Sequence, residues 1–452
     1  MSATNPIRFP DGANRQAMTR RAWWLVVLNL LMPGSVQSLA GSRRLGRIGL
    51  VSTFVLWALV VAGVVLALVA RAALITLVAN GVGLTVLQVL FVYYVVLWIV
   101  LTLDTLRLVR LVRAAPLARP FVAGLAIIAL VVIAGSASYG AVVANDARGL
   151  LSSVFSGGQM ASPIDGRYNI LLLGGDAGAG RYGLRPDSIS VVSIDASTGA
   201  ATLIGVPRNL EDAPFRKGSP MLGPFPNGYN CGNNCLVSYL YTYAEAHPEL
   251  YPDAAKHGST PGVEATRDAI EGVTGLTLQY YVLIDMNGFR QLIDALGGVE
   301  INSTGRYPVG GDIDANGKPI NVILWIKPGL QHMTGWKAMW YARSRHGTDD
   351  YSRMQRQRQV QEAILTQFNP ANVLTKFEGI AAAGEQIVKT DIPQGMLGGF
   401  VDLADKARAQ KVSELELVPA NGYHPSRPDF AKIHKDVAAT LAAASAASAS
   451  AG

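Results

Sequence analysis

Three long apolar runs constrain the fold of this 452-residue chain more than any other feature of its sequence. They cover Ile48–Ala70, Val82–Leu103 and Phe121–Val143. A helix needs about 20 apolar residues to cross a bilayer, and each run is long enough. Half of all residues are apolar and only 16% are charged, which is more apolar than an ordinary soluble enzyme. The sequence therefore predicts an N-terminal α-helical membrane region with three spans.

A fourth apolar run, Ala22–Ala40, is interrupted by residues that do not suit a continuous span. The interruptions are Asn29, Pro33, Gly34, Gln37 and Ser38. Proline breaks helices, and buried amides are costly in hydrocarbon. We interpret this run as a re-entrant or interfacial hairpin.

Arginines flank these runs unevenly, which indicates the topology. The basic segments hold Arg15, Arg20, Arg21, Arg43, Arg44, Arg47, Arg107, Arg110, Arg113 and Arg119, whereas the loop between the first two spans carries only Arg71. Basic loops stay in the cytoplasm. Three crossings then place everything after Val143 outside, which predicts a multi-pass protein of the cell membrane with an extracytoplasmic C-terminal domain. A crossing by Ala22–Ala40 as well would instead put that domain inside or the N-terminus outside.

The chain divides into four predicted parts. Residues 1–143 form the cytoplasmic segment and membrane region, 144–163 a Gly/Ser/Ala linker, 164–441 a folded domain, and 442–452 a disordered Ser/Ala tail. Apolar runs in the domain predict strands at Tyr168–Leu173, Ser188–Ile194, Ala201–Val206, Tyr280–Ile284 and Val322–Ile326. Helical patterns cover Val263–Val273, Met286–Leu296, Thr334–Ala342 and Tyr351–Gln367. This alternation is typical of an α/β fold, here an α–β–α sandwich with a mixed sheet.

The only two cysteines, Cys231 and Cys235, lie in one CGNNC stretch. A zinc site would need more ligands nearby than this pair offers. In an exported domain a local disulfide is the better interpretation. Closing so small a loop contributes about 2 kcal/mol on the chain-entropy model, so the bond would act as a local staple.

A glycine-rich turn carries the first candidate site. Asp176 follows an apolar strand, and Asp187 precedes the next one, with Arg185 two residues before it. Two carboxylates at strand ends can hold a hard cation beside substrate phosphates, although aspartate is also a common turn residue. The segment is no P-loop, because it lacks the Gly-Lys-Ser/Thr ending. Arg208, in the segment VPRN, follows a third strand and could either reach the same edge of the sheet or be a solvated loop residue.

Arginines gather again in YARSRHGTDDYSRMQRQRQVQEAI, residues 341–364. This stretch holds Arg343, Arg345, Arg353, Arg356 and Arg358, with Asp349 and Asp350 between them. Guanidiniums beside an apolar helix surface suit a phosphate on a lipid, because arginine binds phosphate through two parallel hydrogen bonds. The alternatives are a solvated basic face or a nucleic-acid patch, and the predicted outside location argues against nucleic acid.

Together these segments resemble the LytR–CpsA–Psr family of cell-wall glycopolymer ligases. The resemblance covers residues 165–370 and continues to 440. It rests on NILLLGGD, RPDSISVVSID, TLIGVPRN, GVEATRDAIEGVTGLTLQYYVLIDMNGFRQLIDALGGVEI and KPGLQHMTGWKAMWYARSRHGTDDYSRMQRQRQ, in this order. Two features depart from the common pattern. Asn209 stands where the family usually has aspartate, and three spans replace a single anchor. The extra spans and CGNNC look more like actinobacterial members.

The resemblance implies a role for each candidate residue. Asp176 and Asp187 would hold Mg²⁺ (or Mn²⁺) against the pyrophosphate. Arg185, Arg208, Arg343, Arg345 and Arg353 would bind and neutralise phosphates, and Arg356 and Gln357 would contact the substrate. Asp350 would orient the arginines or accept a proton. An apolar tunnel between the sheet and the helices would take the polyprenyl chain.

The expected activity is that of a magnesium-dependent phosphotransferase in cell-wall assembly. It would attach a polyprenyl-pyrophosphate-linked glycopolymer to peptidoglycan and release polyprenyl phosphate, with pyrophosphate cleavage as a side activity. The expected partners are the lipid-linked glycan, the peptidoglycan acceptor and membrane lipid, and no nucleic acid. The alternative is a non-catalytic, membrane-anchored sensor or carrier of such glycans, or a regulator of the transcriptional-attenuator type.

Overall fold

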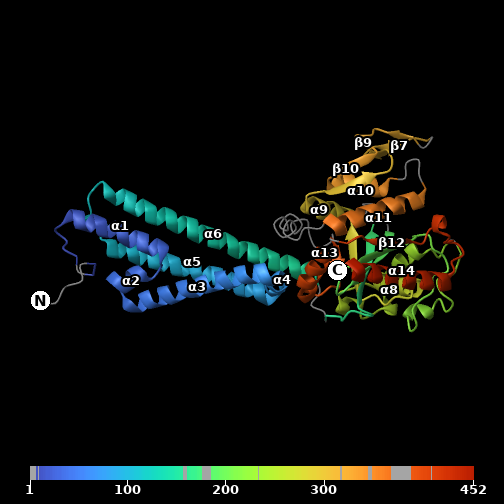
Figure 1. Cartoon of the computed structure of the whole chain (residues 1–452), viewed down its shortest axis with the longest axis horizontal. Coiled ribbons are helices and arrows are strands. Elements are labelled where there is room, and N and C mark those ends of the chain that lie inside the picture. Colours follow the sequence, from blue (N-terminus) through green and yellow to red (C-terminus); the bar gives the residue numbers. More distant parts are fainter. Residues whose placement is uncertain are drawn as a thin grey trace. The chain divides into compact units, whose positions relative to one another are not determined.

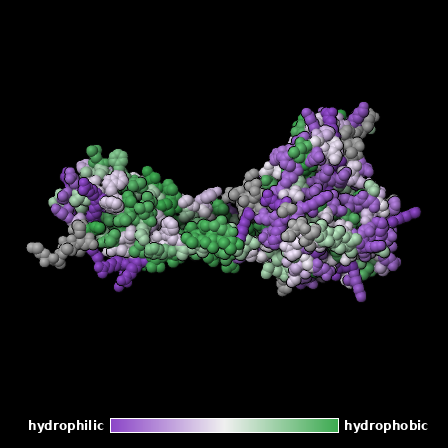
Figure 2. All heavy atoms as spheres, viewed as in Figure 1, coloured by the Kyte–Doolittle hydropathy of each residue, from purple (hydrophilic) through white to green (hydrophobic). Residues whose placement is uncertain are grey.

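The computed structural model describes residues 7–8, 10–155, 160–175, 185–232, 234–315, 318–344, 349–367, 388–408 and 410–451. The chain forms two compact units, Met1–Gly149 and Leu150–Gly452 (Figure 1). The first unit has a surface rich in hydrophobic residues, and the second has a mostly hydrophilic one (Figure 2). Exposed aliphatic side chains such as Leu68 and Val69 on the first unit suit a hydrocarbon surrounding rather than water.

Three helices of the first unit are long and apolar enough to cross a membrane, in agreement with the three predicted spans. They are α3 (Arg43–Val69), α5 (Gly81–Val109) and α6 (Ala118–Val154). The short α4 (Arg71–Ala79) lies between the first two, and a 3₁₀ turn, η1 (Leu111–Arg113), follows α5. Because α6 continues to Val154, the first part of the predicted linker 144–163 is helical rather than extended chain.

The interrupted fourth run forms a helical hairpin made of α1 (Arg15–Leu31) and α2 (Ser35–Ala40). Gly34 adopts a left-handed φ of 93° at the turn, and a Cβ on Gly49 of α3 would lie 2.6 Å from its Cα. Glycine at both positions lets the two backbones pack closely, as small residues do between membrane helices. Buried Gln37 donates to Thr105 of α5 at 3.0 Å, which fixes the other side of the hairpin.

A six-stranded mixed sheet organises the second unit. Its order is β11 (Val388–Thr390), β4 (Tyr280–Asp285), β1 (Arg167–Gly175), β2 (Pro186–Asp195), β3 (Ala201–Val206) and β12 (Ser413–Glu416). The pairs β1–β4 and β3–β12 are parallel, and the other neighbours are antiparallel. The predicted mixed sheet is confirmed.

Helices cover both faces of this sheet, as alternation along the strands requires. Leu171 and Leu173 of β1 pack in the core beneath α7 (Leu240–Ala246), α8 (Pro261–Thr274) and α14 (Phe430–Ala451). Ile170 and Leu172 face the opposite core, to which α11 (Asp350–Gln367) and α13 (Leu397–Ala407) contribute. Short 3₁₀ turns connect these elements: η2 (Pro220–Leu222), η3 (Val237–Tyr239), η4 (Pro248–Leu250), η5 (Ala254–His257), η6 (Gln394–Met396) and η7 (Pro419–Asn421).

A smaller lobe with its own core follows β4. It consists of α9 (Met286–Leu296), α10 (Gly335–Arg343) and three strand pairs, β5 (Val299–Ser303) with β10 (Gly329–Met333), β6 (Tyr307–Val309) with β9 (Leu324–Ile326), and β7 (Asp312–Ile313) with β8 (Pro319–Ile320). The predicted strand Val322–Ile326 is therefore only the three residues of β9. Through α10 this lobe leads directly into the arginine-rich helix α11.

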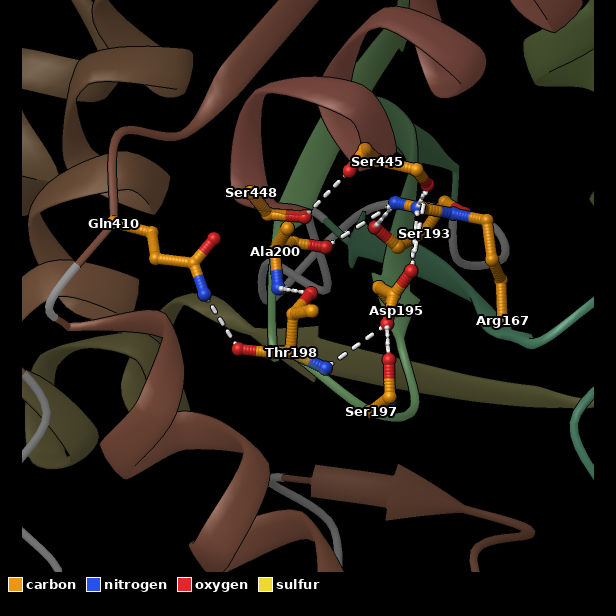
Figure 3. Close-up of polar contacts among 9 residues, drawn as sticks. All are labelled: Arg167, Ser193, Asp195, Ser197, Thr198, Ala200, Gln410, Ser445 and Ser448. Atoms are coloured by element: carbon orange, nitrogen blue, oxygen red, sulfur yellow. Dashed lines mark hydrogen bonds and ion pairs between the residues drawn. The ribbon is translucent and has the colours of Figure 1, made fainter. Parts of the chain in front are cut away.

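The C-terminal tract, predicted to be disordered, is helical as far as Ala451. Alanine is the best helix former, and one side chain of the tract has a structural role. Arg167, only 6% exposed at the start of β1, donates to Ser445 at 2.9 Å and to Ser193 at 2.8 Å (Figure 3). A buried guanidinium needs such partners, so the last helix is tied to the sheet.

Candidate functional site

Four predicted site residues meet at one edge of the sheet. Asp187 is the second residue of β2, and Arg208 follows β3 by two residues. Because β2 and β3 are antiparallel, with Ile189 opposite Val206, the start of one strand lies beside the end of the other. The first turn of α11 brings Asp350 and Arg353 to the same place.

Arg208 bridges two carboxylates at the centre of the site. Its Nη1 donates to Asp187 Oδ1 at 2.6 Å, and its Nε donates to Asp350 Oδ2 at 3.1 Å. Burial alone would lower the pKa of Arg208, but hydrogen bonds and charge from the two aspartates outweigh it and raise the pKa. The guanidinium therefore stays charged and is held in a fixed orientation.

Arg353 approaches the same group from α11. It is 3% exposed, and its Nη2 lies 3.1 Å from Asp350 Oδ1 and 3.4 Å from the backbone oxygen of Asp187. Asp350 thus lies between two guanidiniums, so of its two predicted roles the geometry favours orienting the arginines. Asp, Arg, Asp and Arg alternate here in space, although they come from three different elements.

Two further predicted phosphate ligands lie just before β2 and at the end of α10. Arg185 is exposed just before β2, and its guanidinium carbon lies 4.8 Å from the ring centroid of Tyr239. Arg343 is the last residue of α10, with an exposed side chain. Both arginines are long, exposed side chains on the surface of the second unit.

Arg356 occupies a different environment from the one predicted. It is 2% exposed, its Nε donates to the backbone oxygen of Tyr341 at 3.0 Å, and it also donates to the backbone oxygen of Ser344. Its guanidinium lies over the ring of Tyr307 at 4.5 Å. These contacts satisfy the carbonyls at the end of α10, which gives Arg356 a structural role, and its predicted substrate contact stays a prediction.

Some buried polar atoms around the site have no hydrogen-bond partner among the residues that the structure describes. Gln357 Oε1 and Asn209 Oδ1 are two of them, while Asn209 Nδ2 lies 3.5 Å from the Tyr351 hydroxyl. Buried polar groups normally have partners, and ligands or water supply them where protein does not. The sequence did not predict that Tyr239 and Tyr351 would lie beside site residues. The available signals were the position of Tyr239 shortly after CGNNC and that of Tyr351 next to Asp350.

Of the two predicted metal ligands, Asp187 alone lies within the described residues. Asp176 and Arg345 lie outside the described residues. Over the ranges given above, no group of three or more His, Cys, Asp or Glu side chains assembles a cation site. Asp187, the described member of the predicted pair, accepts a hydrogen bond from Arg208, and the metal site stays a prediction. The predicted disulfide, Cys231–Cys235, is formed.

A model of the LytR_cpsA_psr family matches residues 145–437, which is more than half of the chain. The chain belongs to this family. Among curated proteins, the LytR–CpsA–Psr domain resembles two named polyisoprenyl-teichoic acid–peptidoglycan teichoic acid transferases. TagV of Bacillus subtilis is 26% identical over 39% of this chain and 47% of its own length. TagU of Halalkalibacterium halodurans is 31% identical over 34% and 48%. This chain thus spans about half the length of these relatives.

Solved structures of the family cover much of the same region. The crystal structure of B. subtilis TagV aligns over 62% of this chain and 98% of its own, with 20% identity and a TM-score of 0.43. The family protein YwtF (TagT) with bound octaprenyl pyrophosphate lipid aligns over 63% and 94%, with 17% identity and a TM-score of 0.38.

Proposed function

We propose that this protein transfers a polyprenyl-pyrophosphate-linked glycopolymer to peptidoglycan and releases polyprenyl phosphate. Family membership supports the proposal, and two relatives are named as transferases of teichoic acid to peptidoglycan. The observation that carries it is the pair Arg208 and Arg353, two guanidiniums held at one sheet edge by Asp187 and Asp350. Forked donors fixed in this way match the oxygens of a pyrophosphate.

The chemistry requires positioning and charge stabilisation more than covalent participation by the protein. A hydroxyl oxygen of peptidoglycan would attack the sugar-linked phosphorus and lose its proton. The bond from that phosphorus to the bridging oxygen would break, and the bridging oxygen would leave with polyprenyl phosphate. The product is a phosphodiester between glycopolymer and peptidoglycan. Arg208 and Arg353 would stabilise the negative charge that grows on the leaving phosphate.

Two aspartates have different parts in this proposal. Asp350 accepts from both arginines, so it would hold their donors toward the substrate. Asp187 would bind Mg²⁺ (or Mn²⁺) together with Asp176, and bound metal would neutralise phosphate charge. Arg208 Nη1 donates to Asp187 Oδ1, so a metal would either replace this contact or use the second carboxylate oxygen.

The topology completes the proposal. Three spans and the basic segments around them would place the catalytic domain outside the membrane, beside peptidoglycan. A reporter enzyme that is active only outside the cytoplasm, fused after Gly452, is expected to be active. An inactive but intact fusion would contradict the orientation.

Turnover by the full chain in lipid nanodiscs tests the catalytic function. Wild-type protein is given a short-chain polyprenyl pyrophosphate glycan with Mg²⁺, and released polyprenyl phosphate is measured. Arg353→Ala and Arg353→Lys are both expected to lose at least about a hundredfold in rate, because lysine keeps the charge but not the fork. Arg408→Ala is the matched control, since its guanidinium is exposed and, among the described residues, forms a surface ion pair with Asp405.

The outcomes separate the two classes of function. Loss in both Arg353 variants, with circular dichroism and thermal melting like those of wild type, supports the transferase. Tight binding of the lipid without product from wild type would favour the non-catalytic sensor or carrier. Wild-type rates in both Arg353 variants would remove this site from the mechanism.

A further inference from the structure

An aromatic ring lies against one of the arginines predicted to bind phosphate. The guanidinium carbon of Arg185 is 4.8 Å from the ring centroid of Tyr239, within the range of a cation–π interaction. Arg185 is exposed and Tyr239 is half-buried, so the ring offers a fixed surface to a side chain that would otherwise sample many rotamers. Arginine loses close to 2 kcal/mol of rotamer freedom when it is fixed in place. A ring that fixes it beforehand removes part of this cost from substrate binding.

The segment that carries Tyr239 is anchored to the backbone of the site itself. Tyr239 ends η3, whose Ser238 N–H donates to the backbone oxygen of Arg208 at 3.2 Å. The N–H of Val237 donates to the backbone oxygen of Leu210 at 2.9 Å. Two hydrogen bonds therefore fix η3 on both sides of Asn209. The segment that carries Tyr239 is thus hydrogen-bonded to the segment that carries Arg208.

The disulfide fixes the start of the same segment. Cys235 is buried and bonded to exposed Cys231, and its N–H donates to the backbone oxygen of Gly232 at 2.8 Å. Only Leu236 separates Cys235 from η3. The bond closes a short loop on the N-terminal side of Tyr239, while the hydrogen bonds to Arg208 and Leu210 fix the segment next to it.

We propose that Tyr239 is a positioning residue that holds Arg185 ready for the substrate pyrophosphate, with the Cys231–Cys235 disulfide fixing the segment that carries it. This inference rests on the proposed function and adds a residue to it. Tyr239 touches no reacting atom; it acts through the guanidinium of Arg185. The benefit is pre-organisation, so the loss of the ring should weaken ground-state binding of the lipid pyrophosphate and raise KM more than it lowers kcat.

A double-mutant cycle in the full chain in nanodiscs tests this coupling. Tyr239→Leu removes the ring, and kcat/KM for the polyprenyl pyrophosphate glycan is expected to fall about two- to fivefold, the range of an exposed cation–π interaction. Tyr239→Phe keeps the ring and should restore most of that loss. In an Arg185→Ala background, Tyr239→Leu should cause no further loss, because the ring then has no guanidinium to hold.

Two further variants complete the design. Tyr243→Leu is the matched control: it removes a ring from the adjoining helix α7 that packs on Phe225 and His247 instead of on an arginine. The pair Cys231→Ala and Cys235→Ala should reproduce the Tyr239→Leu loss with Arg185 present and not with Arg185→Ala.

Each result decides something. If Tyr239→Leu lowers kcat/KM equally with and without Arg185, the ring acts only on the fold. If Tyr239→Leu leaves kcat/KM unchanged with Arg185 present, the ring does not contribute to positioning. Either result overturns the inference. If wild type binds polyprenyl pyrophosphate without turnover, the transferase proposal fails. The coupling between Tyr239 and Arg185 is then measured from the Kd of each variant for that lipid. If wild type neither turns it over nor binds it, both proposals fail.

Discussion

Replacing Arg358 by methionine should destabilise the C-terminal unit strongly at pH 7 and much less at pH 5. Arg358 of α11 is one of the most completely buried side chains among the described residues, at 1% exposure. Its Nε lies 2.7 Å from Glu416 Oε1 on the edge strand β12, and it also donates to Gln361. Burial raises the pKa of Glu416, and Arg358 opposes that rise. Without the guanidinium, Glu416 would be a buried carboxylate facing no cation from the part of the chain that the structure describes.

The magnitude follows from the proton that Glu416 can take up. An isolated buried carboxylate becomes neutral instead of staying charged. Protonation at pH 7 of a group whose ordinary pKa is about 4.3 costs about 3.7 kcal/mol, at 1.36 kcal/mol per pH unit. At pH 5 the same proton costs about 1 kcal/mol. The estimate for pH 7 lies within the range of about 3–5 kcal/mol for breaking a buried ion pair.

The sign of the pH dependence is fixed by linkage. In the variant, the pKa of Glu416 is higher in the folded than in the unfolded state, so the folded state binds more protons between the two values. Stability therefore falls as pH rises from about 4.3 toward the folded-state pKa. For a unit of about 300 residues, a loss of 3.7 kcal/mol lowers Tm by about 6 °C, measured by thermal melting of the solubilised chain.

A second variant isolates the charge from the packing. Arg358→Met combined with Glu416→Gln removes both charges, and most of the loss at pH 7 should disappear, since an ion pair replaced by neutral groups is often close to neutral in stability. Equal destabilisation by Arg358→Met at pH 5 and pH 7 would refute this reasoning, because lost packing would then dominate. So would a single variant as stable as wild type at pH 7.

Three other predictions concern separate parts of the chain. Burial would raise the pKa of Asp195, but hydrogen bonds from the next turn lower it to about 2. About 2–3 kcal/mol of stability present above pH 4 should therefore be lost as pH falls toward 2. Asp195→Asn should remove this loss of stability at acid pH in thermal melts. Gly49→Leu should displace the hairpin at Gly34 and expose a cysteine placed at Ser35 to a maleimide, whereas Gly63→Leu should not, because a Cβ at Gly63 meets nothing within 4 Å. Chelation of divalent cations should stop turnover and added Mg²⁺ restore it; unchanged turnover would remove metal from the proposal.

Local pattern was sufficient for elements that carry a long apolar run or a clear apolar period. The three spans, β3 and α9 follow from hydropathy and period alone, and β3 and α9 have the predicted bounds. Seven of the described strands were not predicted, β5 to β8 and β10 to β12, because each has five residues or fewer. Strands β11 and β12 also pair with segments far away in the sequence. Strand β12 looked especially unlike a core strand, since Glu416 points at a buried arginine 58 residues earlier in the chain.

Charge pattern predicted the site less completely than apolar pattern predicted the fold. Asp187, Arg208, Asp350 and Arg353 were all predicted as site residues, and the structure brings them together. Arg356 was expected beside substrate, yet it is buried in the protein. A run of arginines does not reveal which member is buried, because burial depends on partners from other elements, here the carbonyls at the end of α10.

Helix geometry explains why the arginines of α11 divide in this way. At about 100° per residue, Arg356 lies about 60° from Arg353 around the helix, and Arg358 about 140° from it. Arg353 therefore reaches Asp350 and the edge of β2, Arg356 reaches the end of α10, and Arg358 reaches β12. Arg356 and Arg358, which are buried like Arg353, fix the axial rotation of α11 against the smaller lobe on one side and the sheet on the other. That rotation sets the direction in which Arg353 points, so the proposed phosphate-binding geometry would also depend on Arg356 and Arg358.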